Sequence, residues 1–190
     1  MLKKIQNIDE RVSHSWTGAY GRFSEKTKRF LRCYVRLGDG YFWIVVALVL
    51  LAHLGWQATV PIVLNACLAF AIVVALYELI KLNVKRPRPF SVLPSVKQEL
   101  PLMDLYSFPS GHTMNNLAVA TTVMMAMPYY CWFLLLFPLS WGLLRVAFGL
   151  HWLSDVIFGI IFGILCFTVA HFTWIPVSGI LAERLPMLVF

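Results

Sequence analysis

Three short polar clusters interrupt an otherwise apolar sequence, and the residue types in them suit chemistry at a phosphate group. The clusters cover residues 81–89, 107–112 and 145–155. A phosphate dianion requires positive charge, oriented N–H donors, a nucleophile and an acid for the leaving oxygen. Arginine can bind two phosphate oxygens at once. The clusters contain cations, histidines and an acid of the kinds that this chemistry needs, namely Lys81, Arg88, Arg145, His112, His151 and Asp155.

The two histidines have different neighbours, which predicts different roles for them. Asp155 follows His151 by four residues, a spacing at which side chains on a helical turn face each other. Asp155 could therefore accept a hydrogen bond from one ring nitrogen of His151 and leave the other free to attack phosphorus. His112 would then be the general acid. Ser110 and Gly111 open an apolar segment, where the unpaired N–H groups of a helix start favour an anion.

Long apolar segments must position these clusters. Of the 190 residues, 59% are hydrophobic and 13% are charged, against about a quarter charged in soluble domains. Segments of membrane-spanning length predict an all-α, polytopic transmembrane helix bundle of about five spans, at residues 41–56, 58–80, 110–127, 129–148 and 154–174. Strict alternation of these spans places all three clusters at one membrane face. Gly159 and Gly163 in the last span would let a neighbouring helix approach closely.

The amino-terminal segment is basic and amphipathic. Residues 1–36 hold nine of the 16 Lys and Arg residues. Apolar residues at helical spacing among them, such as Ile8, Val12 and Trp16, predict a helix that lies in the membrane interface. A basic segment of this kind can be a solvated tail, a nucleic-acid patch or a surface for anionic headgroups. The adjoining spans favour the lipid bilayer as its partner, with no nucleic acid.

The loop between the second and third predicted spans is long and rich in proline. Its apolar residues Leu93, Val96, Leu102, Met103 and Leu105 predict a lid that dips partly into lipid, since loops of this length are often functional. Other polar side chains in and near this loop have plainer interpretations. We expect Lys85, Arg86 and Lys97 only to extend toward the interface, Asp104 to be solvated, and Glu78 either to pair with Lys81 or to serve the site.

Three motifs in this order resemble one known family. KLNVKRPRP contains K-x6-R-P, PSGH follows, and RVAFGLHWLSD contains R-x5-H-x3-D. Together, residues 81–155 resemble the type 2 phosphatidic acid phosphatase superfamily, and three correctly spaced motifs are far more specific than one. Leu144 stands where the family usually has serine.

The resemblance implies a reaction and a set of site residues. It implies a phosphohistidine on His151, with Asp155 orienting that ring and His112 protonating the leaving group. It also implies that no metal and no cofactor take part, because side chains hold the phosphoryl oxygens, and it assigns that role to Lys81, Arg88, Ser110, Gly111 and Arg145.

We therefore predict one membrane phosphatase domain over residues 1–190, with an interfacial segment 1–36, a transmembrane bundle 41–174 and catalytic motifs within 81–155. The resemblance implies a lipid phosphate as substrate: phosphatidic acid, phosphatidylglycerophosphate, undecaprenyl diphosphate or a lipid A phosphate. In its small size the chain resembles bacterial undecaprenyl diphosphate phosphatases, and this resemblance implies undecaprenyl diphosphate as substrate and a bacterial inner membrane as location. The predicted site face carries 15 of the 16 Lys and Arg residues, which places it in the cytoplasm by the positive-inside rule, although many bacterial relatives have outward-facing sites.

Two alternatives use the same pocket. The phosphohistidine could pass its phosphoryl group to another lipid instead of water, which would make the protein a lipid phosphotransferase. The protein could also be a non-catalytic lipid-phosphate binder or transporter. Binding alone requires cations but neither nucleophile nor acid, so the presence of His112, His151 and Asp155 together favours catalysis.

Overall fold

Helices make up most of the part of the chain that the computed structural model describes, residues 2–101 and 104–184. In chain order they are α1 (Leu2–Gly21), α2 (Glu25–Arg36), the 3-10 helix η1 (Leu37–Asp39), α3 (Tyr41–Val84), α4 (Pro89–Val92), α5 (Gly111–Ala126), α6 (Pro128–Cys131), the 3-10 helix η2 (Trp132–Leu135), α7 (Leu136–Ala147) and α8 (Leu153–Arg184). No strand occurs within these ranges. The predicted all-α class is therefore confirmed. Leu102 and Met103 of the predicted lid lie outside the described residues.

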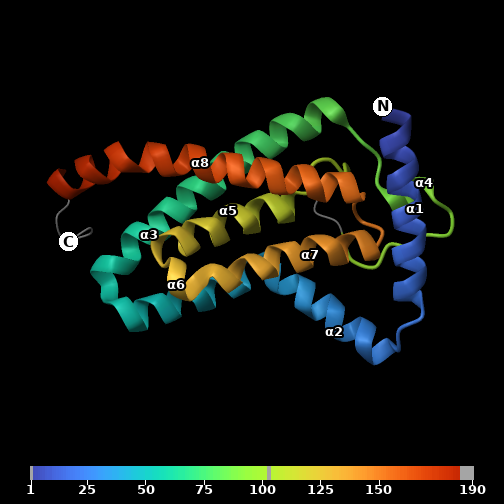
Figure 1. Ribbon diagram of the computed structural model, residues 1–190, viewed down its shortest axis with the longest axis horizontal. Coiled ribbons are helices and arrows are strands. Elements are labelled where there is room, and N and C mark those ends of the chain that lie inside the picture. The colour runs from blue at the N-terminus through green and yellow to red at the C-terminus, as the bar shows by residue number, and fades with distance from the viewer. Residues whose placement is uncertain (1, 102–103, 185–190) are drawn as a thin grey trace.

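Three helical stretches are long and apolar enough to cross a membrane, at Tyr41–Val92, Pro128–Ala147 and Leu153–Leu181. The first contains α3, which turns back on itself in Figure 1. The turn is at Gly55, whose φ of 74° and ψ of 177° are not helical and are open to glycine without steric cost. The bend separates α3 into two arms at the boundary predicted between segments 41–56 and 58–80.

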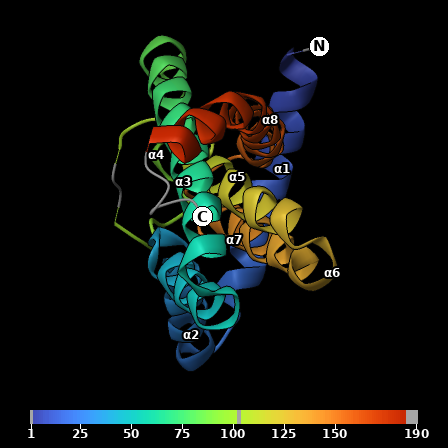
Figure 2. The same cartoon turned by 90° about the vertical axis from the view of Figure 1, so that its left-hand side faces the viewer.

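The central helix of the bundle is α5, which α3, α7 and α8 surround (Figure 2). The approach of α8 to α5 is close because glycines lie at the contact. A Cβ atom on Gly159 would lie 3.0 Å from the carbonyl oxygen of Ser110, and one on Gly163 would lie 2.9 Å from that of Met114. The predicted close packing at Gly159 and Gly163 is confirmed, and it positions the start of α5 against the start of α8.

Large apolar side chains cover the outer faces of α3 and α8. Soluble proteins rarely expose apolar patches of this extent, and on helices long enough to span a bilayer such surfaces are expected to contact lipid. The protein is therefore an integral membrane protein. The exposed residues include Ile44, Val45, Leu48, Val49, Leu79, Leu82, Ile157, Ile161, Ile164, Leu165, Val169 and Phe172.

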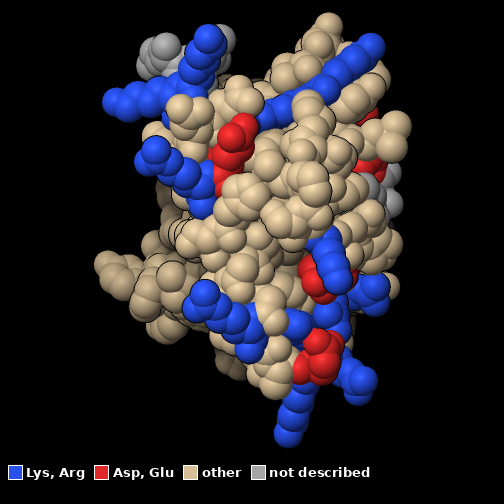
Figure 3. Space-filling model, turned by 90° about the vertical axis from the view of Figure 1, so that its right-hand side faces the viewer, with Lys and Arg blue, Asp and Glu red and all other residues tan. Residues whose placement is uncertain are grey.

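Two helices, α1 and α2, replace the single amino-terminal helix expected from the spacing of apolar residues. Ser24 begins the second by accepting a hydrogen bond from the N–H of Thr27, as N-cap serines do. In Figure 1, α1 runs across the right-hand end of the bundle, at the ends of α7 and α8. Figure 3 shows Lys and Arg side chains gathered on this end of the molecule. The helix buries Asp9, Ser13 and Tyr20 against the bundle.

Candidate active site

The three polar clusters meet at one cavity of about 330 Å³. The side chains come from the end of α3, the residue before α4, the start of α5, the end of α7 and the loop that precedes α8. Two of the eight predicted site residues, Ser110 and Asp155, do not line it and are completely buried. The six that line it are Lys81, Arg88, Gly111, His112, Arg145 and His151.

The ring of His151 is held in one tautomer. Its Nδ1 atom lies 2.8 Å from the carbonyl oxygen of Ser107, and because a carbonyl oxygen only accepts, Nδ1 carries the hydrogen. Nε2 keeps its lone pair and lies 3.4 Å from Nη1 of Arg88. Burial lowers the pKa of His151 well below its usual value, and the charges of Arg88, Arg145 and Lys81 lower it further. The imidazole is therefore neutral and nucleophilic at neutral pH.

Asp155 does not accept the hydrogen bond that its spacing predicts. Nδ1 of His151 lies 3.7 Å from Oδ2 of Asp155, which is too long for a hydrogen bond. The carboxylate of Asp155 instead accepts from the N–H of Trp152 at 2.8 Å and from Nη1 of Arg86 at 2.6 Å. Since α8 begins at Leu153, His151 lies outside the helix and its ring turns toward Ser107. Asp155 still places a negative charge beside the imidazole.

Asp104 pairs with two of the predicted phosphate-binding cations. Its carboxylate lies 2.6 Å from Nζ of Lys81 and 2.8 Å from Nη2 of Arg88. Burial alone would raise the pKa of Asp104, but its contacts with Lys81 and Arg88 outweigh that effect and lower the pKa. The prediction that Asp104 is solvated is wrong, because the buried cations require a counter-charge and the loop supplies one. Lys81 pairs with Asp104 rather than with Glu78.

Asp39, which the sequence analysis did not select, is the second carboxylate at the cavity. Its Oδ1 atom lies 2.6 Å from Nε2 of His112 and 3.6 Å from Nη2 of Arg145. Burial would raise the pKa of Asp39, but the hydrogen bond and charge of His112 and the charge of Arg145 lower it. Asp39 therefore accepts a hydrogen bond from His112. The sequence feature that could have identified Asp39 is its position between two glycines, directly before the first apolar span.

Several buried hydrogen-bond donors at the cavity have no acceptor among the described residues. Within the described residues, the Nε atoms of Arg88 and Arg145 are buried without a hydrogen-bond partner, although buried N–H groups are normally paired. The first N–H groups of α5, including that of Gly111, also have no acceptor inside the helix. Ser110 is engaged elsewhere: its N–H donates to the carbonyl of Asp155 at 3.1 Å, and its hydroxyl pairs with that of Thr113 at 3.0 Å. The free donors suit a tetrahedral oxyanion.

Arg86 is part of a buried network, so the prediction that it only extends to the interface is wrong. Its guanidinium donates to Asp155 at 2.6 Å, to the hydroxyl of Ser154 at 2.7 Å and to Asp9 at 2.7 Å. It also lies 5.3 Å from the ring centre of Trp152. Both carboxylates are buried, and a buried carboxylate requires a paired cation.

The cavity continues into the apolar part of the bundle. An adjoining cavity of about 170 Å³ shares Asp39 and His112 with it, and a third, of about 380 Å³, shares Trp43 and Val119 with the second. Phe70 lines all three. Only apolar residues line the third cavity. The cationic cavity is therefore adjacent, through the second cavity, to an apolar cavity between α3 and α5.

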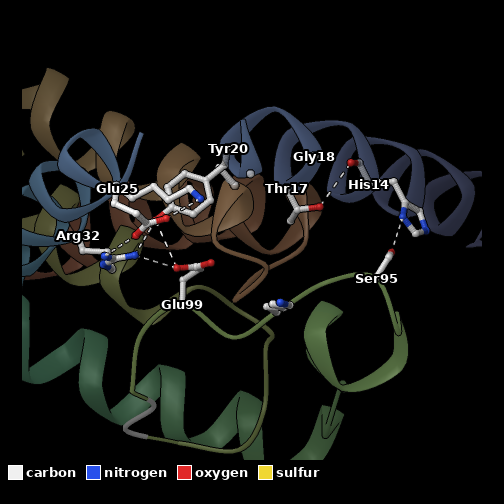
Figure 4. A pocket seen from close by; sticks show the side chains of 12 residues that line it. His14, Thr17, Gly18, Tyr20, Glu25, Arg32, Ser95 and Glu99 are labelled. Carbon is white, nitrogen blue, oxygen red and sulfur yellow. Dashed lines mark hydrogen bonds and ion pairs between the residues drawn. The ribbon is translucent and has the colours of Figure 1, made fainter. Parts of the chain in front are cut away.

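A separate cavity of about 590 Å³ lies between α1, α2 and the loop at residues 95–99 (Figure 4). It contains none of the predicted site residues. Arg32 donates to Glu99 at 3.1 Å and to the hydroxyl of Tyr20 at 3.3 Å (Figure 4). These bonds attach the loop to the amino-terminal helices, and the cationic cavity remains the candidate active site.

A family model matches the part of the chain that contains the three polar clusters. The model of the PAP2 superfamily matches residues 62–176. An undecaprenyl-diphosphatase of Sulfolobus acidocaldarius is 30% identical over 129 residues, which cover 67% of this chain and 61% of the relative. The match thus spans about three fifths of that relative's length.

Two solved structures share the fold. A crystal structure of Aquifex aeolicus LpxE superposes with a TM-score of 0.62 at 24% identity, covering 83% of this chain and 92% of the other. That of the first transmembrane PAP2 type phosphatidylglycerolphosphate phosphatase from Bacillus subtilis has a TM-score of 0.65 at 21% identity, covering 88% and 85%.

Proposed function

The chain belongs to the PAP2 superfamily, and from this we propose that it is a membrane lipid phosphatase that hydrolyses a lipid phosphomonoester or diphosphate through a phosphohistidine on His151. The observation that carries the proposal is the contact between Nδ1 of His151 and the carbonyl of Ser107. This contact leaves Nε2 unprotonated beside the guanidinium of Arg88. A neutral, oriented imidazole next to a phosphate-binding cation is what nucleophilic attack on phosphorus requires.

The proposed reaction has two steps. Nε2 of His151 attacks phosphorus, the bond from phosphorus to the lipid oxygen breaks, and His112 donates a proton to that oxygen. A water molecule then gives a proton to His112 and attacks the phosphohistidine, which releases inorganic phosphate and restores both histidines. Asp39 supports His112 in its protonated form through the 2.6 Å contact, and Asp155 supports the positive charge that develops on His151.

The phosphoryl oxygens are held by side chains and backbone in this proposal. Lys81, Arg88 and Arg145 supply positive charge, and the N–H of Gly111 supplies a donor at the start of α5. Ser110 contributes only if its hydroxyl rotates away from Thr113. Substrate must also displace the carboxylate of Asp104 from its two cations. The cations provide the electrostatic stabilisation that a metal ion would otherwise provide, so we propose that the reaction is independent of metal.

The shape of the cavity supports a substrate with a long apolar tail. The polar cavity, a second cavity and the apolar cavity between α3 and α5 follow one another and share lining residues. Apolar surface in such a cavity favours a hydrocarbon chain through the hydrophobic effect. The relative from Sulfolobus acidocaldarius is named an undecaprenyl-diphosphatase. We therefore place undecaprenyl diphosphate first among the candidate substrates, before phosphatidylglycerophosphate and phosphatidic acid.

Phosphate release by the purified protein tests the function. In detergent, with EDTA present, we expect free phosphate from at least one of these three lipids, at a rate that excess EDTA does not change. A newly phosphorylated lipid instead of free phosphate would establish phosphotransfer. Binding of all three lipids without turnover would establish a non-catalytic binder. Loss of release in EDTA that added divalent metal restores would contradict metal independence.

We propose a single domain with five spans, two of them the arms of α3 and the others α5, the α6–α7 segment and α8, with α1 in the interface. The concentration of basic side chains at the α1 end (Figure 3) supports a cytoplasmic site in a bacterial inner membrane.

Labelling of Cys33 tests this orientation, because Cys33 lies on α2 and is exposed. A membrane-impermeant maleimide should label it only after cells are permeabilised, whereas labelling of intact cells would place the site outside.

A further inference from the structure

The carboxylate of Asp9 is buried in the bundle although it belongs to the amino-terminal helix. Its side chain is 2% exposed. Oδ1 accepts from the N–H of Ser154 at 2.9 Å, and Oδ2 accepts from the hydroxyl of Ser154 at 2.6 Å and from Nη2 of Arg86 at 2.7 Å. Burying a carboxylate costs several kcal/mol unless such partners are present. Asp9 does not line the catalytic cavity, and the proposed reaction steps do not use it.

One role of Asp9 is to cap α8. The residue before this helix is Trp152, whose side chain has no oxygen to accept from the first free N–H groups. Asp9 supplies that acceptor to Ser154 from a helix that lies 145 residues earlier in the chain. Asp155 completes the turn by accepting from the N–H of Trp152. Two carboxylates at the positive end of the helix dipole stabilise this start.

Arg86 connects Asp9 to the catalytic groups. One guanidinium nitrogen donates to Asp9 at 2.7 Å and the other to Asp155 at 2.6 Å, so the two carboxylates share one cation. Asp155 in turn lies 3.7 Å from Nδ1 of His151. Without the charge of Asp9, Arg86 would have Asp155 as its remaining carboxylate partner, and the first turn of α8 would lose a cap. Both changes would alter the position and the charge of Asp155 beside the imidazole.

We propose that Asp9 is a positioning residue for the nucleophile and acts through Arg86 and Asp155, so that α1 is part of the active site as well as a membrane-interface helix. The proposal rests on the proposed function of this site. It assigns a catalytic consequence to a charge that does not line the cavity.

The test compares Asp9→Asn with Glu10→Gln. Both remove one negative charge from α1 and keep the side-chain size, but Glu10 bonds only to Gln6, at the surface. We expect Asp9→Asn to lower kcat about 10- to 100-fold with KM within about two-fold of wild type, and Glu10→Gln to change neither. Asp9→Glu, which keeps the charge, should recover part of the lost kcat.

A second readout does not depend on phosphatase activity. Carbethoxylation of His151 by diethyl pyrocarbonate at a series of pH values, followed by mass spectrometry, reports the pKa of its imidazole. The charged groups that face this ring are Lys81, Arg88 and Arg145 on one side and Asp155 on the other. In Asp9→Asn the positive charge of Arg86 is less compensated, and this charge disfavours protonation of His151. The midpoint of the pH dependence of carbethoxylation should therefore fall by about half a pH unit, and it should not change in Glu10→Gln.

These readouts separate the possible outcomes. Wild-type kcat and an unmoved His151 midpoint in Asp9→Asn would overturn the proposal, as would equal losses in Glu10→Gln. If Asp9→Asn does not fold, Arg86→Lys replaces it, because a single ammonium cannot bridge both carboxylates, and the same kcat loss and a moved midpoint are expected. If the wild type releases no phosphate, the proposed function fails, and the carbethoxylation midpoint alone decides whether Asp9 positions His151.

Discussion

His151→Ala is expected to lower phosphate release by about 10⁴-fold or more, the size of effect found when a nucleophile is removed. The loss should be this large because no second group can take over the attack. The ring of His112 is held 2.6 Å from Asp39, and two of the carboxylates that line the cavity, Asp39 and Asp104, are paired with cations. Release of phosphate from the lipid that the wild type hydrolyses fastest is the measurement.

The matched control is His53→Ala, which removes an exposed histidine of α3 and should leave the rate unchanged. A second measurement follows the intermediate directly. Wild-type protein quenched during turnover of a lipid labelled with ³²P in its phosphate should carry acid-labile label, and His151→Ala should carry none. A residual rate within ten-fold of wild type, or label retained on the variant, would assign the nucleophile to another residue.

Gly159→Leu is expected to inactivate the protein by separating two helices. A Cβ atom at this position would lie 3.0 Å from the carbonyl oxygen of Ser110 and 3.1 Å from Cβ of Thr113, so a leucine side chain has no room. Overpacking of this kind costs about 1–3 kcal/mol, and each kcal/mol lowers Tm by roughly 2–4 °C in a chain of this size. Displacement of the start of α5 by about 1 Å should also cost about 100-fold in rate.

The same helix offers a control for this prediction. Gly179 also lies on α8 but has no other atom within 4 Å of a Cβ placed there. Gly179→Leu adds the same side chain and should change neither Tm, measured in detergent, nor phosphate release. Equal Tm and rate in Gly159→Leu and wild type would show that α5 and α8 can move apart without disturbing the site.

Structural features that depend on residues close together in the sequence could be predicted from the sequence alone. Hydrophobic runs of spanning length located the membrane helices, and the boundary predicted between segments 41–56 and 58–80 lies at the bend that the structure places at Gly55. The pair Gly159 and Gly163 predicted a close helix contact from its spacing alone. Three clusters with family-like spacing identified the residues that converge on the cavity, because alternating spans bring every second loop to the same face.

Features set by distant partners could not be predicted. Asp9, Asp39 and Asp104 are distant in the sequence from the groups that they contact, and only the folded chain places each beside a cation or imidazole. The bond from Asp155 to His151 was expected from a helical spacing, but α8 begins two residues after His151, so the spacing rule did not apply there. The ring instead donates to the backbone carbonyl of residue 107. Because every residue type has a backbone carbonyl, the identity of the residue at this position does not predict the hydrogen bond.

The carboxylates at the cavity have a consequence for how substrate arrives. Lys81, Arg88 and Arg145 face Asp39 and Asp104, and the rim residues Arg36 and Glu78 cancel, so the lining carries one formal positive charge. A site so nearly neutral exerts little long-range attraction on an anion, and salt screens that attraction within about 10 Å. For the lipid substrate that we propose, capture therefore depends on diffusion within the plane of the bilayer. The effective substrate concentration is a surface density, set by the mole fraction of the lipid in the membrane rather than by its amount in the surrounding volume.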